Sequence, residues 1–178
     1  MIVVLMGVSG SGKTTIGTLL AERAGAVFAD ADDYHPIANK QKMAAGHPLD
    51  DDDRQPWLET LNQMMRDWFQ QGISGVLACS ALKAKYRQTL ASGMPDGTVD
   101  FVLLAGSPEL IAQRLAARHH EYMNPALLAS QLKTLEPPTE EEAFSIVNDR
   151  PPGIVVDEIL SRVTRSKGIE SSSERVSH

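Results

Sequence analysis

The residues whose types and spacing indicate chemistry most directly occupy positions 7–14. They read Gly-Val-Ser-Gly-Ser-Gly-Lys-Thr, which fits the phosphate-binding pattern G-x-x-x-x-G-K-[ST]. Glycines let the backbone wrap tightly with its N–H groups turned toward a phosphate, and the helix that follows presents its positive end there. Lys13 can then reach the β- and γ-phosphates, and the Thr14 hydroxyl can ligate Mg²⁺. The predicted nucleoside triphosphate site comprises Gly7, Val8, Ser9, Gly10, Ser11, Gly12, Lys13, Thr14 and Thr15.

Two carboxylates, Asp30 and Asp32, follow the next apolar run of the chain, residues 26–29. Residues two apart in an extended chain point the same way, so both carboxylates can face the phosphate site. The alternative for this pair is an acidic helix cap ahead of Pro36. We therefore expect the two aspartates to belong to the site, with a capping role as the competing interpretation.

Motifs that the chain lacks narrow the class of nucleotide-binding protein. Regulatory GTPases use N-K-x-D and D-x-x-G, and neither string occurs. Motor and transporter ATPases carry an aspartate for Mg²⁺ at a strand end, whereas the apolar run 75–79 ends without one. A small-molecule kinase fits better. We expect Thr14, Asp30 and Asp32 to hold Mg²⁺, and Lys13 and Asp32 to be catalytic, Asp32 by accepting or orienting the proton of an acceptor hydroxyl.

The elements that must position these groups alternate between short apolar runs and periodic amphipathic segments. This alternation predicts an α/β fold, a three-layer sandwich in which helices cover both faces of a five-stranded parallel sheet, with the ligand at the carboxyl ends of the strands. Strands are expected at residues 2–6, 26–29, 75–79, 99–105 and 143–147. Helices are expected after the phosphate loop, at 37–45, from the acidic run at 50–53 to Gly72, and at 82–91, 108–118, 125–135 and 154–163.

The domain organisation follows from the same pattern. Residues 1–165 form one kinase domain, in which the insertion at about 119–142 is a candidate lid. The polar, serine-rich tail 166–178 has little to bury and is expected to be disordered. The four aspartates at 50–53 could suggest a metal site, but a helix cap is the favoured interpretation. Cys79 is expected to be a small buried core residue.

Composition bounds the partners and the compartment. The 178 residues are 42% hydrophobic and 22% charged, as in an ordinary globular domain. A net charge of −6 argues against a nucleic-acid binder. No window approaches 18 apolar residues, so we expect no membrane partner. The single cysteine fits a reducing compartment, and we expect a cytoplasmic protein.

Several segments beyond the phosphate loop carry a resemblance to a known family. Residues 30–36 read Asp-Ala-Asp-Asp-Tyr-His-Pro, residues 79–83 read Cys-Ser-Ala-Leu-Lys, and parts of 39–58 and 127–137 match too. Over about residues 3–165 the chain resembles gluconate kinase. The resemblance implies a nucleoside-kinase-like P-loop kinase fold with a helical lid, usually a homodimer. It also implies transfer of a phosphoryl group from ATP, with Mg²⁺, to O6 of D-gluconate, giving 6-phospho-D-gluconate and ADP.

The chemistry of that substrate suggests which residues recognise it. D-gluconate is a carboxylate on a row of hydroxyls, so it calls for a guanidinium fork and short polar groups. Arg54 is the leading candidate for the fork, with Lys83 and Arg87 nearby on one helical face, although each could be a surface residue. His35 could bond a substrate hydroxyl or be a structural histidine.

Two arginines ahead of the lid resemble nucleotide-binding arginines of related kinases. Arg114 and Arg118 would meet the ATP phosphates and stack on adenine, or else form a solvated basic helix end. The chain departs from the family at 120–122, which read His-Glu-Tyr in place of Gly-His-Phe, and at Val147, where an aspartate is usual. A kinase of another small acid or nucleotide, such as shikimate or a nucleoside monophosphate, and an ATP-binding sensor without turnover are the competing hypotheses.

Overall fold

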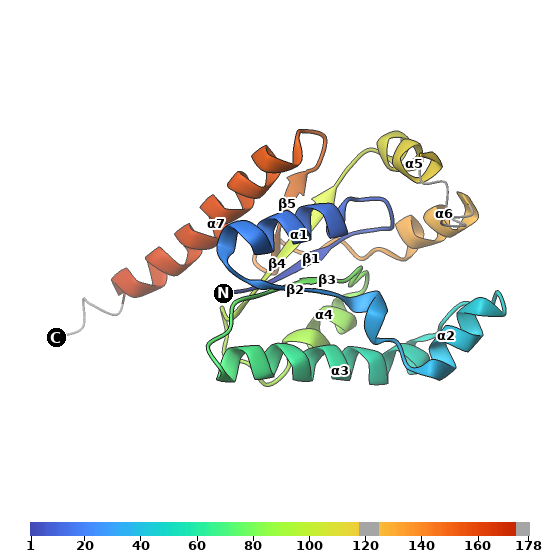
Figure 1. The fold of residues 1–178 in the computed structure, drawn as a ribbon, viewed down its shortest axis with the longest axis horizontal. Coiled ribbons are helices and arrows are strands. Elements are labelled where there is room, and N and C mark those ends of the chain that lie inside the picture. Colours follow the sequence, from blue (N-terminus) through green and yellow to red (C-terminus); the bar gives the residue numbers. More distant parts are fainter. Residues whose placement is uncertain (118–124, 174–178) are drawn as a thin grey trace.

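A parallel sheet of five strands forms the centre of the molecule (Figure 1). The computed structural model describes the backbone of residues 1–117 and 125–173, and the side chains of residues 1–117 and 128–164. The strands are β1 (Ile2–Met6), β2 (Val27–Asp30), β3 (Gly75–Ala78), β4 (Val99–Ala105) and β5 (Ala143–Val147). Their order is β2-β3-β1-β4-β5, which places β1 and the loop that follows it in the middle. The predicted α/β class with a five-stranded parallel sheet is confirmed.

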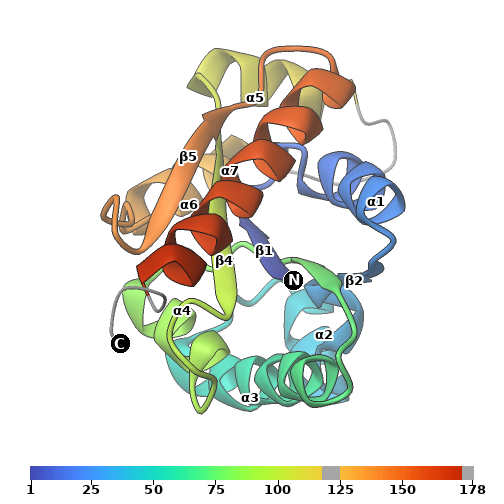
Figure 2. The same cartoon turned by 90° about the vertical axis from the view of Figure 1, so that its left-hand side faces the viewer.

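Helices cover both faces of the sheet, as the three-layer prediction requires. Figure 1 shows α1 (Lys13–Ala24) and α7 (Pro152–Ser173) on one side, and α3 (Asp51–Gln70) and α4 (Ala84–Ala91) on the other. Figure 2 shows α7 crossing the strands on the side opposite α3. Because β1 is buried on both faces, its residues alternate between two cores and are all apolar.

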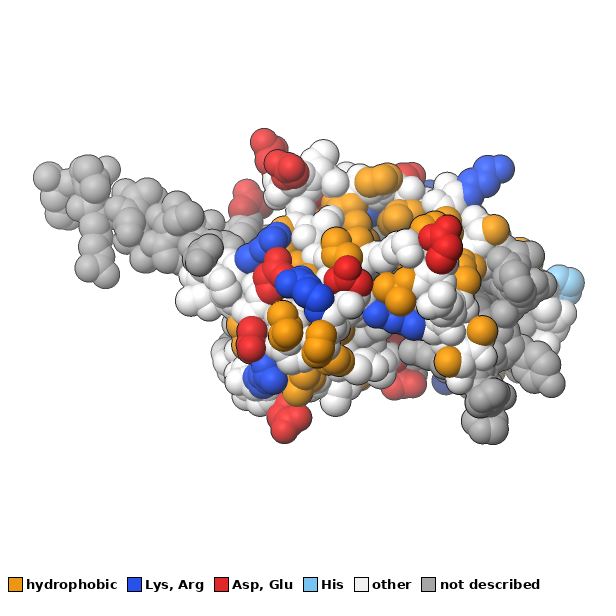
Figure 3. All heavy atoms as spheres, turned by 90° about the horizontal axis from the view of Figure 1, so that it is seen from above, with side chains coloured by type: hydrophobic (Ala, Val, Ile, Leu, Met, Phe, Trp, Pro, Cys, Tyr) orange, Lys and Arg blue, Asp and Glu red, His pale blue; other side chains and the backbone are white. Residues whose placement is uncertain are grey.

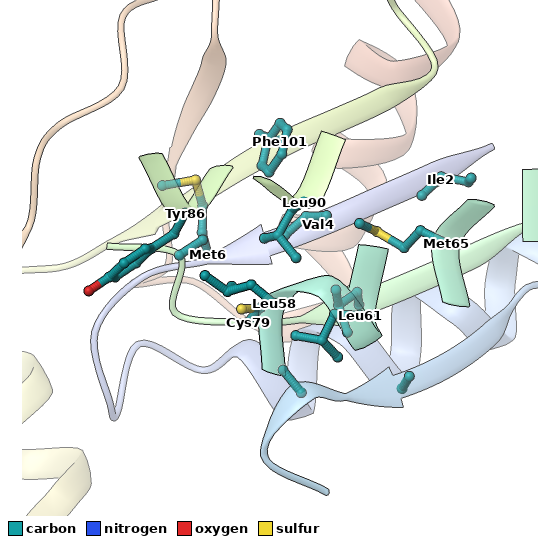
Figure 4. Packing of buried hydrophobic residues seen from close by; sticks show 14 of the residues in the cluster. Ile2, Val4, Met6, Leu58, Leu61, Met65, Cys79, Tyr86, Leu90 and Phe101 are labelled. Carbon is teal, nitrogen blue, oxygen red and sulfur yellow. The ribbon is translucent and has the colours of Figure 1, made fainter. Parts of the chain in front are cut away.

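The core beneath α3 and α4 fixes the position of the strand that carries the phosphate loop. Figure 4 shows Val4 and Met6 of β1 facing Leu58 and Leu61 of α3. Cys79 lies in the same core, 2% exposed, and burial raises the pKa of its thiol to about 12. The predicted structural role of this cysteine agrees with that environment.

The acidic run 50–53 begins α3, as the capping interpretation requires. The Asp50 side chain accepts a hydrogen bond from the Asp53 N–H, and the Asp53 side chain accepts one from the Asp50 N–H. Such a capping box satisfies two N–H groups that the helix start leaves unpaired. Among the described residues, no group of three His, Cys, Asp or Glu residues could hold a metal ion.

The remaining elements gather at the carboxyl ends of the strands. They are the 3₁₀ helix η1 (Ala31–Tyr34), α2 (Ile37–Ala44), α5 (Pro108–Ala116) and α6 (Pro125–Thr134). Figure 1 shows α5 and α6 above this end of the sheet and α2 below it. The bounds expected for α5 extended to Arg118, but the helix ends at Ala116, and residues 118–124 of the candidate lid lie outside the described residues.

The last helix is longer than expected. The sequence predicts it at 154–163, whereas α7 continues to Ser173; the disorder expected from residue 166 stays a prediction. The segment contains no proline, and extending an existing helix costs little because each added residue gains a hydrogen bond. Residues 174–178 lie outside the described residues.

The face formed by α1 and α7 carries acidic and basic side chains close together (Figure 3). Arg23 pairs with Asp157 at 2.5 Å, and Glu158 pairs with both Arg150 and Arg162. This face therefore shows no extended patch of a single charge sign. In the part of the chain that the structure describes, no helix has the length and apolar character needed to cross a membrane.

Candidate active site

The loop between β1 and α1 has the backbone geometry of a phosphate cradle. Gly7, Gly10 and Gly12 have φ angles of 142°, 81° and 97°. Gly12 also has no room for a side chain, since a Cβ there would lie 2.3 Å from Nδ2 of Asn148. Helix α1 begins at Lys13, so the unpaired N–H groups of its first turn adjoin the loop.

Lys13 lies against the loop. Its Nζ donates to the carbonyl oxygens of Gly7 at 3.0 Å and Val8 at 3.1 Å. An ammonium group held over the loop is close to the position where bound phosphates would lie. The arrangement is that expected of the lysine in a phosphate loop.

The three predicted metal ligands lie together. Thr14 Oγ1 donates to Asp30 Oδ2 at 3.3 Å, and Asp30 Oδ1 accepts from the Asp32 N–H at 3.0 Å. Asp30 therefore caps η1 and contacts the phosphate loop at the same time, so the two interpretations of this residue are compatible. The extended geometry assumed for the pair needs correction, because Asp32 lies in the 3₁₀ helix and not in the strand.

The oxygen ligands of this group suit Mg²⁺. Magnesium is bound by one or two carboxylates, by substrate phosphates and by waters, and it needs no complete protein cage. Thr14 and Asp30 offer oxygens beside the cradle, and the Asp32 side chain is 86% exposed. These residues would hold the ion, which neutralises phosphate charge when bound.

His35 is packed and faces Asp32. Its ring stacks on Trp57 with centroids 4.2 Å apart, and Asn39 Nδ2 lies 3.4 Å from Nδ1. A donor at Nδ1 places the ring hydrogen on Nε2, which lies 3.9 Å from Asp32 Oδ1. Burial, with the nearby charges of Arg54 and Lys40, lowers the pKa of His35, so the ring is neutral at pH 7. Both the structural role and a contact to a substrate hydroxyl remain open to this residue.

Arg54 and Lys83 belong to a cationic cluster around one carboxylate. Asp51 accepts hydrogen bonds from Lys83 at 3.1 Å, from Lys85 and from the Tyr86 hydroxyl. Arg54 Nη1 donates to the same Tyr86 hydroxyl at 2.9 Å. The hydrogen bonds from Lys85, Tyr86 and Lys83 hold the pKa of Asp51 well below its ordinary value. Three cations against one carboxylate give this cluster a net positive charge.

Sequence reasoning missed Lys85, Tyr86 and the role of Asp51. The resemblance to gluconate kinase includes Asp51 and Tyr86 among its matching positions, but it gives neither residue a role in the site. Lys83 precedes α4 as its N-cap residue, so it does not share a helical face with Arg87 in the way expected.

The structure corrects the prediction that Arg87 binds the substrate. Its side chain is 2% exposed, and its guanidinium pairs with Glu142 at 2.6 Å and donates to the Ala81 carbonyl at 3.0 Å. Ala81 has a φ of 45°, an uncommon conformation for a residue with a side chain. Arg87 therefore supports the loop ahead of Lys83, and none of these contacts is directed at a ligand.

We expect Arg87→Met to destabilise the fold by about 2–4 kcal/mol at pH 7, because breaking a buried ion pair leaves polar groups without partners. Arg87 lowers the pKa of Glu142, so the contribution of this pair is present above the ordinary carboxyl pKa and is lost as the pH falls. Denaturant unfolding at pH 7 and pH 4 measures both effects. An unchanged stability together with a raised acceptor KM would restore the original assignment.

Asn148, which sequence reasoning also missed, joins β5 to the phosphate loop. Its side-chain Nδ2 donates to the Ser11 carbonyl at 2.7 Å, and its backbone carbonyl accepts from Arg114 Nη2. Arg114 Nη1 is buried and finds no hydrogen-bond partner among the described residues, and it would lie 3.9 Å from a Cβ on Gly12. A buried donor at this place suits a phosphate oxygen, which supports the nucleotide role predicted for Arg114. Arg118 lies outside the described residues.

The fold and this site define a P-loop kinase, a class in which a parallel sheet presents a phosphate loop, a lysine and acidic residues at its carboxyl edge. Residues 2–138 match the family described as AAA domain. The chain belongs to the gluconokinase family.

Full-length relatives carry that assignment. The chain is 43% identical over 189 residues to a probable gluconokinase of Xenopus tropicalis. This alignment covers 98% of this chain and 100% of that protein. A gluconokinase from Sinorhizobium meliloti 1021 is 37% identical with a TM-score of 0.83, over 99% of this chain and 97% of that one. Shikimate kinase from Acinetobacter baumannii, at 21% identity and a TM-score of 0.63 over 93% and 94%, shares the fold.

Proposed function

We propose that this chain transfers the γ-phosphoryl group of ATP to O6 of D-gluconate, giving 6-phospho-D-gluconate and ADP. The observation that carries the proposal is the cationic cluster of Arg54, Lys83 and Lys85 around Tyr86 and Asp51. Such a cluster suits the carboxylate of a sugar acid, and the relatives reported above are a probable gluconokinase and a gluconokinase.

The cluster and the phosphate loop adjoin each other through two routes. The Gly7 N–H donates to the Ser80 carbonyl at 3.2 Å, three residues before Lys83. Arg54, in turn, is close enough to His35 to lower the pKa of that ring, and His35 lies 3.9 Å from Asp32. An acid held at the cluster would thus extend its hydroxyls toward Asp32 and the γ-phosphate.

Each residue of the site has a defined role in this reaction. Asp32 accepts or orients the proton of the attacking O6 hydroxyl, and neutral His35 holds a substrate hydroxyl or Asp32. Lys13, the loop N–H groups and Arg114 balance the charge on the transferring phosphoryl group. Thr14, Asp30 and Asp32 would hold Mg²⁺.

We expect Arg54→Ala to lower kcat/KM for D-gluconate about 30-fold to several-thousand-fold, which corresponds to about 2–5 kcal/mol for a lost charge-assisted contact. Arg54→Lys should recover only part of the loss, because an ammonium lacks the planar two-point geometry. ATP affinity should stay near that of the wild type. Steady-state kinetics with D-gluconate and with sorbitol, an uncharged polyol, measure the effect.

The comparison of the two acceptors decides what Arg54 does. The wild type should prefer D-gluconate strongly, and Arg54→Ala should lose that preference by losing activity on D-gluconate alone. Equal losses on both acceptors would show that Arg54 organises the site, for example through Tyr86. Arg66→Ala is the matched control, since Arg66 lies twelve residues further along α3, about 18 Å away.

A coupled ADP-release assay with D-gluconate, shikimate, glycerate and AMP tests the function as a whole. Release stimulated by D-gluconate alone supports the proposal. Stimulation by shikimate or AMP would favour a kinase of another small acid or nucleotide, and no stimulation by any acceptor would favour a sensor. The likeness to shikimate kinase carries no substrate argument, because it is a likeness of fold.

Three further properties belong to the proposal and rest on the family resemblance and the composition. The enzyme requires Mg²⁺, it is a homodimer, and it works in the cytoplasm, where its single cysteine stays reduced. Arg118 and the lid at about 119–142 complete the nucleotide site when ATP is bound. Activity after chelation measures the Mg²⁺ requirement, and sedimentation of the purified chain measures its oligomeric state.

A further inference from the structure

One side chain of α6, Gln131, makes hydrogen bonds to the phosphate loop. The Ser9 N–H donates to Gln131 Oε1 at 2.7 Å, and Gln131 Nε2 donates to Ser9 Oγ at 3.3 Å. Both ends of the glutamine amide are therefore used on one residue of the cradle, 122 positions away in the chain. A two-point contact fixes the orientation as well as the distance of its partner.

Apolar packing supports this contact. Val8, the neighbour of Ser9 in the loop, lies in a small cluster with Leu82, Ile111 and Leu128. Leu132 and Leu135 pack against the same cluster from the α6 side. The phosphate loop, α6 and the loop after β3 thus share one packed unit, separate from the two larger cores of the sheet.

The end of the same segment holds the loop that bears Lys83. The Glu136 N–H donates to the Leu82 carbonyl at 2.8 Å, and Glu136 Oε2 accepts from the Ala84 N–H at 2.8 Å. These two bonds flank Lys83 on both sides. The short segment 131–136 therefore touches the phosphate loop at one end and the cationic cluster at the other.

We propose that Gln131 is a positioning residue that couples ATP binding to acid binding through the segment 131–136. Phosphates bound in the cradle restrict the motion of Ser9, and the hydrogen bonds of Gln131 to Ser9 then hold α6 in place. The hydrogen bonds of Glu136 in turn hold the backbone of Leu82 and Ala84, on either side of Lys83. Each ligand orders a loop that the other needs, so each lowers the cost of binding the other. This inference rests on the proposed function, because the acid half of the coupling is D-gluconate.

The test is the affinity of the non-hydrolysable nucleotide AMPPNP, with Mg²⁺, measured by calorimetry in the absence and presence of saturating D-gluconate. The wild-type Kd should fall about 5-fold or more when D-gluconate is present, within the usual range of coupling between sites. We call the Kd for AMPPNP without D-gluconate, divided by the Kd with D-gluconate, the coupling ratio. In Gln131→Ala this ratio should approach one, while the Kd without D-gluconate changes less than about 3-fold. Ser9→Ala, which keeps the N–H contact, should give an intermediate ratio.

A matched control and a local readout complete the design. Gln88→Ala removes an exposed helical glutamine from α4 and should keep the wild-type ratio. Amide hydrogen exchange followed by NMR should show faster exchange of the Ser9 N–H in Gln131→Ala alone, because its acceptor is gone. If Gln131→Ala fails to fold, Ser9→Ala and the wild type still decide the coupling.

The outcomes separate this inference from the proposed function. A wild type that phosphorylates D-gluconate but has a ratio of one overturns the coupling and leaves the function. A wild-type ratio that persists in Gln131→Ala also overturns it. No turnover of D-gluconate by the wild type overturns the proposed function, and the acid half of the coupling with it.

Discussion

Lys13→Ala is expected to lower kcat by about 10²-fold or more, because the ammonium supplies positive charge where negative charge lies on the transferring phosphoryl group. The ammonium lies against the carbonyls of Gly7 and Val8, in the loop that we expect to bind the phosphates. The loss should appear in kcat more than in the KM for D-gluconate, since the acid binds elsewhere. ADP release at saturating ATP measures it.

Lys133→Ala is the control for this experiment, because Lys133 is an exposed lysine of α6 that makes no part of the cradle. Its kcat should equal that of the wild type. A Lys13→Ala variant with near-normal kcat would show that the loop does not act as the phosphate site.

Asp32→Asn is expected to lower kcat by about 10²–10⁴-fold, the usual effect of losing a general base. The amide keeps the shape of the side chain but accepts a proton poorly and attracts Mg²⁺-bound water less. Because Thr14 bonds Asp30, which the substitution leaves in place, ATP affinity should be nearly unchanged. Calorimetry with AMPPNP and turnover of D-gluconate, measured on the same preparation, separate binding from chemistry.

Asp33→Asn offers a close comparison, since Asp33 is the next residue of η1 and is also exposed. It should keep full activity. If Asp32→Asn turns over as fast as the wild type, the base lies elsewhere and Asp32 has a structural role beside His35.

Much of the fold was predictable because it depends on local patterns. The bounds of β4 and β5 agree with the expected 99–105 and 143–147, since apolar runs flanked by polar residues mark a buried strand clearly. The phosphate loop and the cap of α3 were also read directly, because each is a short motif with a local physical cause.

The site was less predictable, because its contacts join distant parts of the chain. Asn148 reaches Ser11 across 137 positions, and no periodicity in the sequence marks such a contact. Arg87 was expected to bind a substrate on the strength of its charge, but the structure pairs it with Glu142, 55 positions away. Charge and spacing identify candidates, whereas the partner that neutralises each charge is decided by the tertiary fold.

The burial of Cys79 makes the chain suitable for site-specific labelling. Burial raises the pKa of this thiol and leaves it 2% exposed, so it stays protonated at pH 7 and maleimide reagents should not reach it. Because this is the chain's one cysteine, new cysteines can be introduced without first removing a native one. Exposed positions such as Lys40 in α2 and Lys133 in α6 could then carry a pair of fluorophores. The energy transfer between them would report, in single molecules, how far the two sides of the site approach each other as ligands bind.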